Sequence, residues 1–127
     1  MKKLILILLF STVMFSSSSY AEWMGVTGNV SGDTHYVDFE RIRKHDGYVY
    51  YWTLSDYLKP KTSGMLSAKL YTQGDCKLLR LKRLSWSFHN EPMGGGTGDV
   101  SEPSNKSWVY ATPDSSNESI LKSVCNR

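Results

Sequence analysis

The sequence predicts a small α+β domain that is mainly β, with one C-terminal helix and one disulfide. Three observations lead to this prediction. Most of the chain after residue 21 consists of short β-branched and aromatic runs separated by turn residues. The final segment spaces its apolar residues as a helix does. The two cysteines of the chain, Cys76 and Cys125, follow an export signal, and such a pair usually forms a disulfide in an oxidising compartment.

Residues 1–21 are predicted to be a secretory signal peptide. Lys2 and Lys3 supply the positive start, and the apolar run over 4–15 is shorter than the ~20 residues that span a membrane. Cleavage is expected between Ala21 and Glu22, which leaves the domain 22–127. No cysteine stands just after the apolar run, as a lipoprotein signal requires, so we expect no lipid attachment and no stable membrane anchor after cleavage. The mature protein is then periplasmic or secreted.

Removal of the signal lowers the net charge. The full chain carries 15 basic and 12 acidic residues, a net charge of +3, and loss of Lys2 and Lys3 leaves 13 against 12. A net charge of +1 does not favour binding to a polyanion, so no nucleic-acid partner is expected.

The first half of the domain is expected to contain three strands, over 22–27, 34–39 and 48–57. The pair Asp46-Gly47 is a strong hairpin signal and leads the chain into the third of these strands. A short basic stretch over 41–44 precedes the hairpin.

The second half is expected to continue the sheet. Residues 65–72 alternate as a half-buried strand does, and Gly74-Asp75 predicts a turn. Cys76 would then open the longest strand, 76–88. The apolar residues of this strand change phase midway, which predicts a β-bulge near Lys82-Arg83.

The end of the chain is expected to hold a loop, a strand and a helix. Residues 91–105 are rich in Gly, Pro and Ser and predict a long loop, and 107–111 predict a short strand. Ser115 and Glu118 fit a capping box for the helix. Its apolar stripe leads to Cys125, so the disulfide would hold the helix against the sheet.

No pattern predicts catalysis or a cofactor. The three histidines, His35, His45 and His89, lack the spacing of metal ligands. No serine lies in a nucleophile elbow, and the glycine run at 94–96 lacks the lysine of a phosphate loop. We therefore expect a protein that is not an enzyme and that has no cofactor and no metal.

Basic residues interleaved with aromatic ones are the main surface feature. They are expected to share a sheet face that contacts a partner, and the candidate residues are Lys77, Arg80, Lys82, Arg83, Trp86, Arg41, Arg43 and Lys69. The partner on this reading is acidic: a protein patch, a glycosaminoglycan or anionic lipid. The alternative is an ordinary polar sheet face, on which the Lys and Arg stems cover apolar surface.

A set of short motifs runs in a fixed order and spacing along the mature chain: Trp23; Tyr36-Val37-Asp38 with Ile42-Arg43; Val49, Trp52 and Leu54-Ser55-Asp56-Tyr57; Ser67; Asp75-Cys76 with Arg80 and Arg83-Leu84-Ser85; Met93-Gly94; Trp108; and Val124-Cys125. In the order and spacing of these residues the chain resembles the bacterial surface-adhesin E family. The resemblance spans the mature chain.

The resemblance implies a single curved antiparallel sheet of about six strands, packed by the C-terminal helix and linked to it by the disulfide. It also implies a cell-surface protein that attaches to host matrix or plasma proteins. The namesake type is lipid-anchored, whereas a free periplasmic or secreted form fits the signal predicted here. Two alternatives to adhesion stay open at this point: a periplasmic protein that binds a small, haem-like ligand, and an inhibitor or partner of another envelope protein. The sequence predicts neither the partner's identity nor the oligomeric state.

Overall fold

The computed structural model describes residues 21–127, and the predicted signal peptide lies outside them except for Ala21. Within this range the chain forms strands, short 3-10 turns and one α-helix. The elements are β1 (Trp23–Gly28), β2 (Thr34–Asp38), η2 (Phe39–Arg41), β3 (Arg43–His45), β4 (Tyr48–Asp56), η3 (Thr62–Gly64), β5 (Ser67–Asp75), β6 (Arg80–His89), η4 (Pro92–Gly94), β7 (Val100–Ser101), β8 (Val109–Tyr110) and α1 (Ser116–Cys125).

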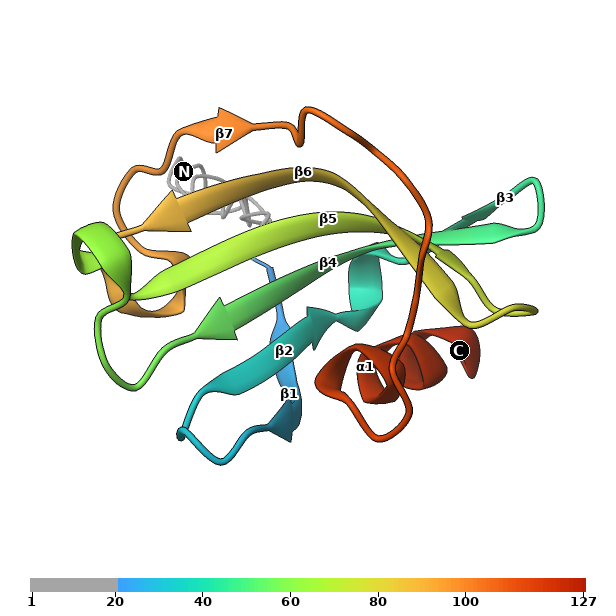
Figure 1. Cartoon of the computed structure of the whole chain (residues 1–127), viewed down its shortest axis with the longest axis horizontal. Helices are drawn as coiled ribbons and strands as arrows, with labels where there is room; N and C mark the ends of the chain where they lie inside the picture. The colour runs from blue at the N-terminus through green and yellow to red at the C-terminus, as the bar shows by residue number, and fades with distance from the viewer. Residues whose placement is uncertain (1–20) are drawn as a thin grey trace, which may run out of the picture.

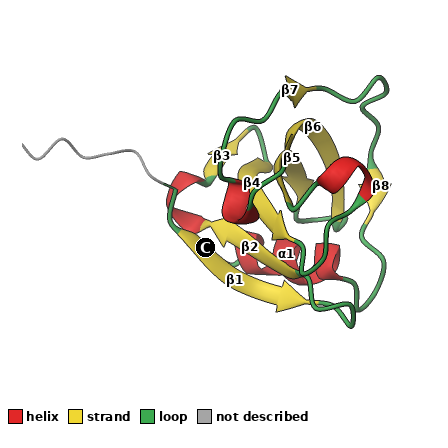
Figure 2. Cartoon of the chain, turned by 90° about the vertical axis from the view of Figure 1, so that its left-hand side faces the viewer, coloured by secondary structure: helices red, strands yellow, loops and turns green. Residues whose placement is uncertain are grey.

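The strands make one antiparallel sheet. Its main path runs β1-β2-β4-β5-β6-β7, and the short strands β3 and β8 pair with β4 and β6 outside that path. Figure 1 shows β5 and β6 bending along their length, with α1 placed across one end of the sheet. Seen from the side, the helix lies behind β1 and β2 (Figure 2). The predicted mainly β fold, with about six main strands and a C-terminal helix, is confirmed.

The hairpin predicted at Asp46-Gly47 is present. Both residues have positive φ angles, 52° and 84°, and they join β3 to β4 in antiparallel register. Two successive left-handed residues make a two-residue turn whose twist matches that of the strands. Glycine accepts this conformation at no steric cost, and aspartate is among the residues that tolerate it best.

The predicted β-bulge lies in β6, one residue beyond the expected position. Tyr71 pairs with Ser85 and Thr72 pairs with Arg83, so Leu84 has no partner across the ladder. The extra residue reverses the phase of the strand. As a result Leu81 and Trp86 lie on the same side of the sheet although their sequence numbers differ in parity.

The predicted turn at Gly74-Asp75 and the strand predicted to open at Cys76 were wrong. Both turn residues belong to β5, the chain turns over 76–79, and β6 begins at Arg80. The shift has a local cause. Asp75 accepts hydrogen bonds from the backbone N–H groups of Lys77 (3.0 Å) and Leu78 (3.2 Å), so it begins the turn while still paired in the sheet.

The segment 91–105 is more ordered than the predicted loop, since it contains η4 and β7. It also covers part of the sheet. The buried hydroxyl of Ser67 donates to the Glu91 carbonyl (2.6 Å) and accepts from the Gly94 N–H (2.8 Å). The residue is therefore fully satisfied beneath the η4 turn.

The core lies between α1 and one end of the sheet. The Ser115 side chain caps the helix by accepting from the Glu118 N–H at 3.2 Å, as the predicted capping box requires. The helix then buries its apolar stripe against three strand residues. These core residues are Ile120, Leu121 and Val124 with Val37, Val49 and Tyr51.

The helix approaches β5 closely at Gly74. A Cβ atom at this position would lie 2.6 Å from Leu121 Cδ1 and about 3 Å from side-chain atoms of Val49 and Tyr51. Any larger residue would therefore push α1 away from the sheet, and overpacking of this kind is destabilising. Gly74 is in the strand because the helix needs the space.

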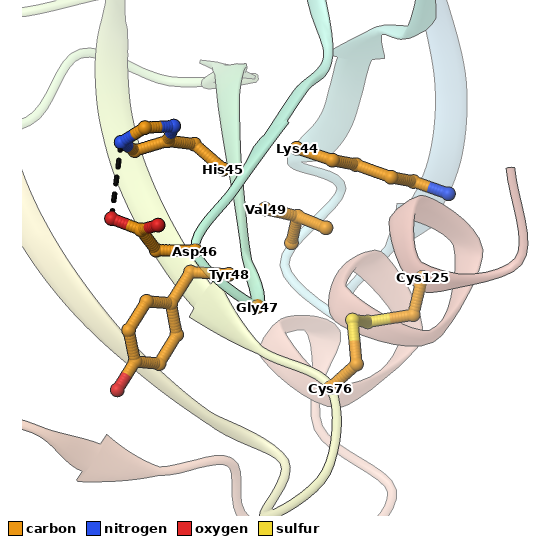
Figure 3. Close-up of a pocket in the computed structure, with 8 residues that line it drawn as sticks. All are labelled: Lys44, His45, Asp46, Gly47, Tyr48, Val49, Cys76 and Cys125. Carbon is orange, nitrogen blue, oxygen red and sulfur yellow. Dashed lines mark ion pairs between the residues drawn. A yellow bond between two sulfur atoms is a disulfide. The ribbon is translucent and has the colours of Figure 1, made fainter.

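The predicted disulfide between Cys76 and Cys125 is confirmed. It joins the β5–β6 turn to the last residue of α1, with the two Cα atoms 5.8 Å apart. The two cysteines line a hollow of about 360 Å³ together with residues of the β3–β4 hairpin. Figure 3 shows these residues and the bond. Both cysteines are half-buried.

Reduction of the disulfide should release α1 before the sheet unfolds. The bond closes a loop between residues 49 apart in sequence, and in the chain-entropy model such a loop contributes about 4 kcal/mol to the free energy of unfolding. We expect the melting temperature to fall on reduction, and amide hydrogens of α1 to exchange before those of β4 and β5. A reduced protein with an unchanged melting temperature would show that the bond does not hold the helix.

Candidate partner-binding surface

The sheet face that points away from α1 gathers aromatic and basic side chains. Alternation along β4 places Tyr48, Tyr50 and Trp52 on this side, because Val49 and Tyr51 are buried against the helix. The strand register then determines which residues of β3, β5 and β6 lie beside these rings on the same face. We call this surface the aromatic–basic face; it comprises Arg43, Tyr48, Tyr50, Trp52, Lys69, Tyr71, Arg80, Lys82 and Trp108.

The rings of this face pack against one another across strands. Tyr71 of β5 lies between two β4 residues, with its ring centroid 6.3 Å from that of Tyr50 and 4.8 Å from that of Trp52. Trp108, just before β8, packs against Tyr48 with centroids 5.3 Å apart. Such pairs fix side chains that would otherwise lose conformational freedom on binding.

Three cations lie over these rings. Arg43 lies 5.9 Å from the Tyr50 centroid and donates a hydrogen bond to the Tyr71 hydroxyl at 3.3 Å. Arg80 and Lys82 lie 4.3 Å and 4.6 Å from the Trp108 centroid. The rings thus orient the positive charges without neutralising them.

Arg80 is held further by a carboxylate. Its Nε atom lies 2.8 Å from Asp75 Oδ2, and Asp75 is buried at the end of β5. Burial alone would raise the pKa of the Asp75 carboxyl, but hydrogen bonds from Arg80 and from the N–H groups of Leu78 and Lys77 outweigh it and lower the pKa. Arg80 therefore mainly holds the start of β6 in place, because its charge is already paired with Asp75 and is not free for a partner.

A small hollow of about 160 Å³ adjoins the face beside Trp52 and Lys69. Arg41 and Trp23 line it from η2 and β1, and the Arg41 Nε atom lies 3.3 Å from the buried carboxylate of Asp38. The hollow extends the aromatic–basic face toward the start of the described chain.

The structure brings together some of the predicted partner-binding residues and separates others. Arg43, Lys69, Arg80 and Lys82 share the aromatic–basic face, and Arg41 borders it. Lys77 is exposed in the β5–β6 turn rather than on the strand. Arg83 and Trp86 pair with Thr72 and Leu70, and so lie on the side of α1.

The candidate residues chosen from the sequence included none of the five rings of the aromatic–basic face. Every second residue of a strand points to the same face, so the sequence alone could have placed Tyr48, Tyr50 and Trp52 together on one face. No local signal indicates that Tyr71 joins this row or that Trp108 reaches Tyr48, because both contacts depend on strand pairing between distant segments.

The described residues show no group of three or more His, Cys, Asp or Glu side chains placed to hold a metal ion. In the same part of the chain, no helix has the length and apolar character needed to cross a membrane. What the face offers chemically is recognition: fixed rings, oriented cations and hydrogen-bond donors.

A disulfide-linked antiparallel sheet that displays rings and cations on one face has the features of a binding module. Comparison with known families gives the particular family: the model of the surface-adhesin protein E family matches residues 23–126. The chain therefore belongs to the surface-adhesin protein E family and is an adhesin-like surface protein. Members of such a family are typically non-enzymatic. No match was found among curated proteins.

Solved structures of protein E from Haemophilus influenzae share the fold. One crystal form superposes with a TM-score of 0.64 at 19% identity, and the match covers 86% of this chain and 91% of that one. A structure of protein E from the non-typeable organism gives a TM-score of 0.59 at 18% identity, covering 87% of this chain and 79% of that one. At this level of identity the likeness establishes the arrangement of the sheet and helix.

Acid should weaken the Asp75–Arg80 pair. A carboxyl whose pKa is lowered by folding stabilises the protein fully above its unfolded pKa of ~3.9, and this contribution is lost as pH falls through the lower folded pKa. We expect Asp75→Asn to lower the free energy of unfolding by about 1–2 kcal/mol at pH 7. Urea denaturation should show the difference from wild type shrinking below pH ~4.

Asp46→Asn is the matched control for this prediction. Asp46 is exposed in the hairpin turn and pairs with the exposed His45, and asparagine tolerates its positive φ angle. Its urea midpoint should stay close to that of wild type at neutral pH. Equal midpoints for Asp75→Asn and Asp46→Asn at pH 7 would contradict a stabilising role for the pair.

Proposed function

We propose that this protein is an exported, non-enzymatic binding protein that contacts host matrix proteins, or other extracellular or envelope proteins, through the aromatic–basic face. The observation that supports this most is the convergence of five aromatic rings and four cations onto one side of the sheet, from strands β3 to β6 and the segment before β8. The surface-adhesin family supports the same class of partner.

The composition of the face favours a protein partner. Tyr, Trp and Arg are enriched where proteins bind one another, because they combine large contact area with polar ends. The rings are partly buried against each other, so binding would order few further side chains. An acidic patch on the partner would meet Arg43 and Lys82, and attraction between the patches would speed association.

Arg43 and Lys82 are the residues best suited to a test. Each lies over a ring and forms no ion pair with a carboxylate among the described residues. Arg80 is unsuitable, because reversing its charge would leave Asp75 without its partner. Arg83 is unsuitable because it lies on the opposite side of the sheet.

Reversal of the charge at either of these two positions should weaken binding to the partner. We expect Arg43→Glu and Lys82→Glu each to weaken binding to a panel of immobilised extracellular-matrix and plasma proteins by about tenfold or more, since like charges across an interface repel. Lys59→Glu, in the exposed β4–β5 loop, changes the net charge equally and should bind as wild type does. Unchanged binding of both face variants, with folding verified by circular dichroism, would exclude this surface.

The cellular location gives a second test of the proposal. Cell fractionation with N-terminal sequencing should find a mature chain that begins at Glu22 and lies in the periplasm, on the cell surface or in the medium. Accessibility of intact cells to an added protease would show surface display. Retention of uncleaved protein in the cytoplasm would contradict an exported binding protein.

A further inference from the structure

A second hollow, of about 210 Å³, lies on the helix side of the sheet, away from the aromatic–basic face. It forms where α1 begins and the sheet continues beyond it. Strands β2, β4, β5 and β6 and the first turn of α1 contribute its walls, and the residues that matter for its chemistry are Arg83, His35, Tyr57, Ser116 and Asn117.

Arg83 brings a positive charge into this hollow. The bulge at Leu84 and the alternation of β6 place Arg83 on the side of the apolar residues Leu81 and Trp86. Its guanidinium donates to Thr72 Oγ1 at 3.4 Å and to Asn117 Oδ1 at 3.1 Å, and burial lowers its pKa. A guanidinium stays protonated in proteins at ordinary pH, so the hollow holds a full charge.

No carboxylate of the described chain pairs with Arg83. The ion pairs of residues 21–127 involve other cations, and its two hydrogen-bond acceptors are neutral. Two of the five guanidinium N–H groups are thus used, and about three remain for another acceptor. Arg83 is half-buried, and a partly desolvated charge without a counter-charge is costly, so its place in a hollow makes it a candidate functional residue.

Other donors surround the same space. The backbone N–H groups of Ser116 and Asn117 precede the first hydrogen bond within α1, which runs from Ser119 to Ser115. Burial raises the pKa of the Tyr57 hydroxyl, which therefore keeps its proton. Arg83, Tyr57, Ser116 and Asn117 all line the hollow, so each brings donor groups to its walls.

The acidic groups nearby are already engaged. Asp33 accepts from the Leu58 N–H and pairs with Lys61 at 3.2 Å, and Glu118 accepts from the Asp114 N–H and pairs with Lys122. Burial is the main reason why the pKa of His35 is lowered, so this ring is neutral at pH 7 and adds no positive charge. Among the residues that line the hollow, Arg83 is the one that carries a charge at pH 7.

We propose that this hollow is a binding site for a small oxyanion, the carboxylate or phosphate group of a small molecule, with Arg83 as its anchor. A guanidinium offers two parallel N–H donors that match either group, and the start of a helix favours negative charge. Sites for drug-sized ligands measure ~300–1,000 Å³, so a hollow of about 210 Å³ suits a ligand of few atoms rather than a haem.

The competing explanation is purely structural. On that view Arg83 serves to tie β6 and β5 to the first turn of α1 through Asn117 and Thr72. This role requires the hydrogen bonds but not the charge, and it predicts no response to anions. The site is independent of the aromatic–basic face, so the two proposals can fail separately.

NMR titration of the folded protein with succinate, inorganic phosphate or chloride at matched ionic strength tests the proposal. We expect succinate, phosphate or both to shift the amide signals of Ser116 and Asn117 and the ring signals of His35 along a saturable curve, while chloride does not. The two oxyanions separate a carboxylate site from a phosphate site. Arg83→Gln should weaken this binding at least tenfold, and Tyr57→Phe should weaken it less.

Lys77→Gln is the matched control, because it removes one positive charge from the exposed β5–β6 turn at a residue that does not line the hollow. Its binding should stay within twofold of wild type. No saturable shift with either oxyanion, shifts confined to exposed lysines, or equal binding by Arg83→Gln would each overturn the proposal. If Arg83→Gln does not fold, the position of the shifts in wild type and the response of Tyr57→Phe still decide it.

Discussion

The structure depends on one short helix that has to cover one face of a wide sheet. Ten residues at ~1.5 Å each give α1 a length of about 15 Å, whereas six strands spaced ~4.8 Å apart are about 24 Å wide. The helix therefore builds a core at one end only, where Leu121 sits over Gly74. The disulfide compensates for the small contact area by fixing the end of α1 to the β5–β6 turn. The part of this face that the helix does not reach is where the hollow around Arg83 forms.

The two sides of the sheet thus have different chemistry for one reason. The helix side must supply apolar residues for the core, so alternation sends the rings and cations of β4 and β5 to the other side. There they have no helix to cover them, and they pack against each other instead. Arg83 is the exception: it follows the phase of Leu81 into the helix side. A charge on the helix side contributes nothing to the apolar core. Among the basic residues, Arg83 is therefore the one whose position points most directly to a binding role.

The sequence was sufficient for the order of the elements, the disulfide and the hairpin at Asp46-Gly47, because these follow from local chemistry. The bulge was also predictable, since the phases of Leu81 and Trp86 conflict in a regular strand. The turn was misplaced because a Gly-Asp pair is typical of turns. Gly74 is instead in β5, where the close approach of Leu121 leaves no room for a side chain. The candidate site was predicted in part. Arg83 and Lys82 were assigned to one face because they are adjacent in sequence, although adjacent strand residues point to opposite faces of a sheet. The contacts of Tyr71 and Trp108 could not be predicted, because they depend on pairing between segments that are distant in sequence.

The irregular outer side of β6 has a consequence for solubility. β7 pairs with Trp86 and Ser87, and β8 pairs with Arg80 and Leu81, so no described strand covers residues 82–85 from that side. An open edge of this kind invites pairing with the edge of another molecule. Here the gap carries Lys82 and Arg83, and the unpaired Leu84 distorts the ladder between them. The same bulge that sorts side chains between the two faces therefore also discourages edge-to-edge aggregation of a sheet whose outer face carries many half-buried rings.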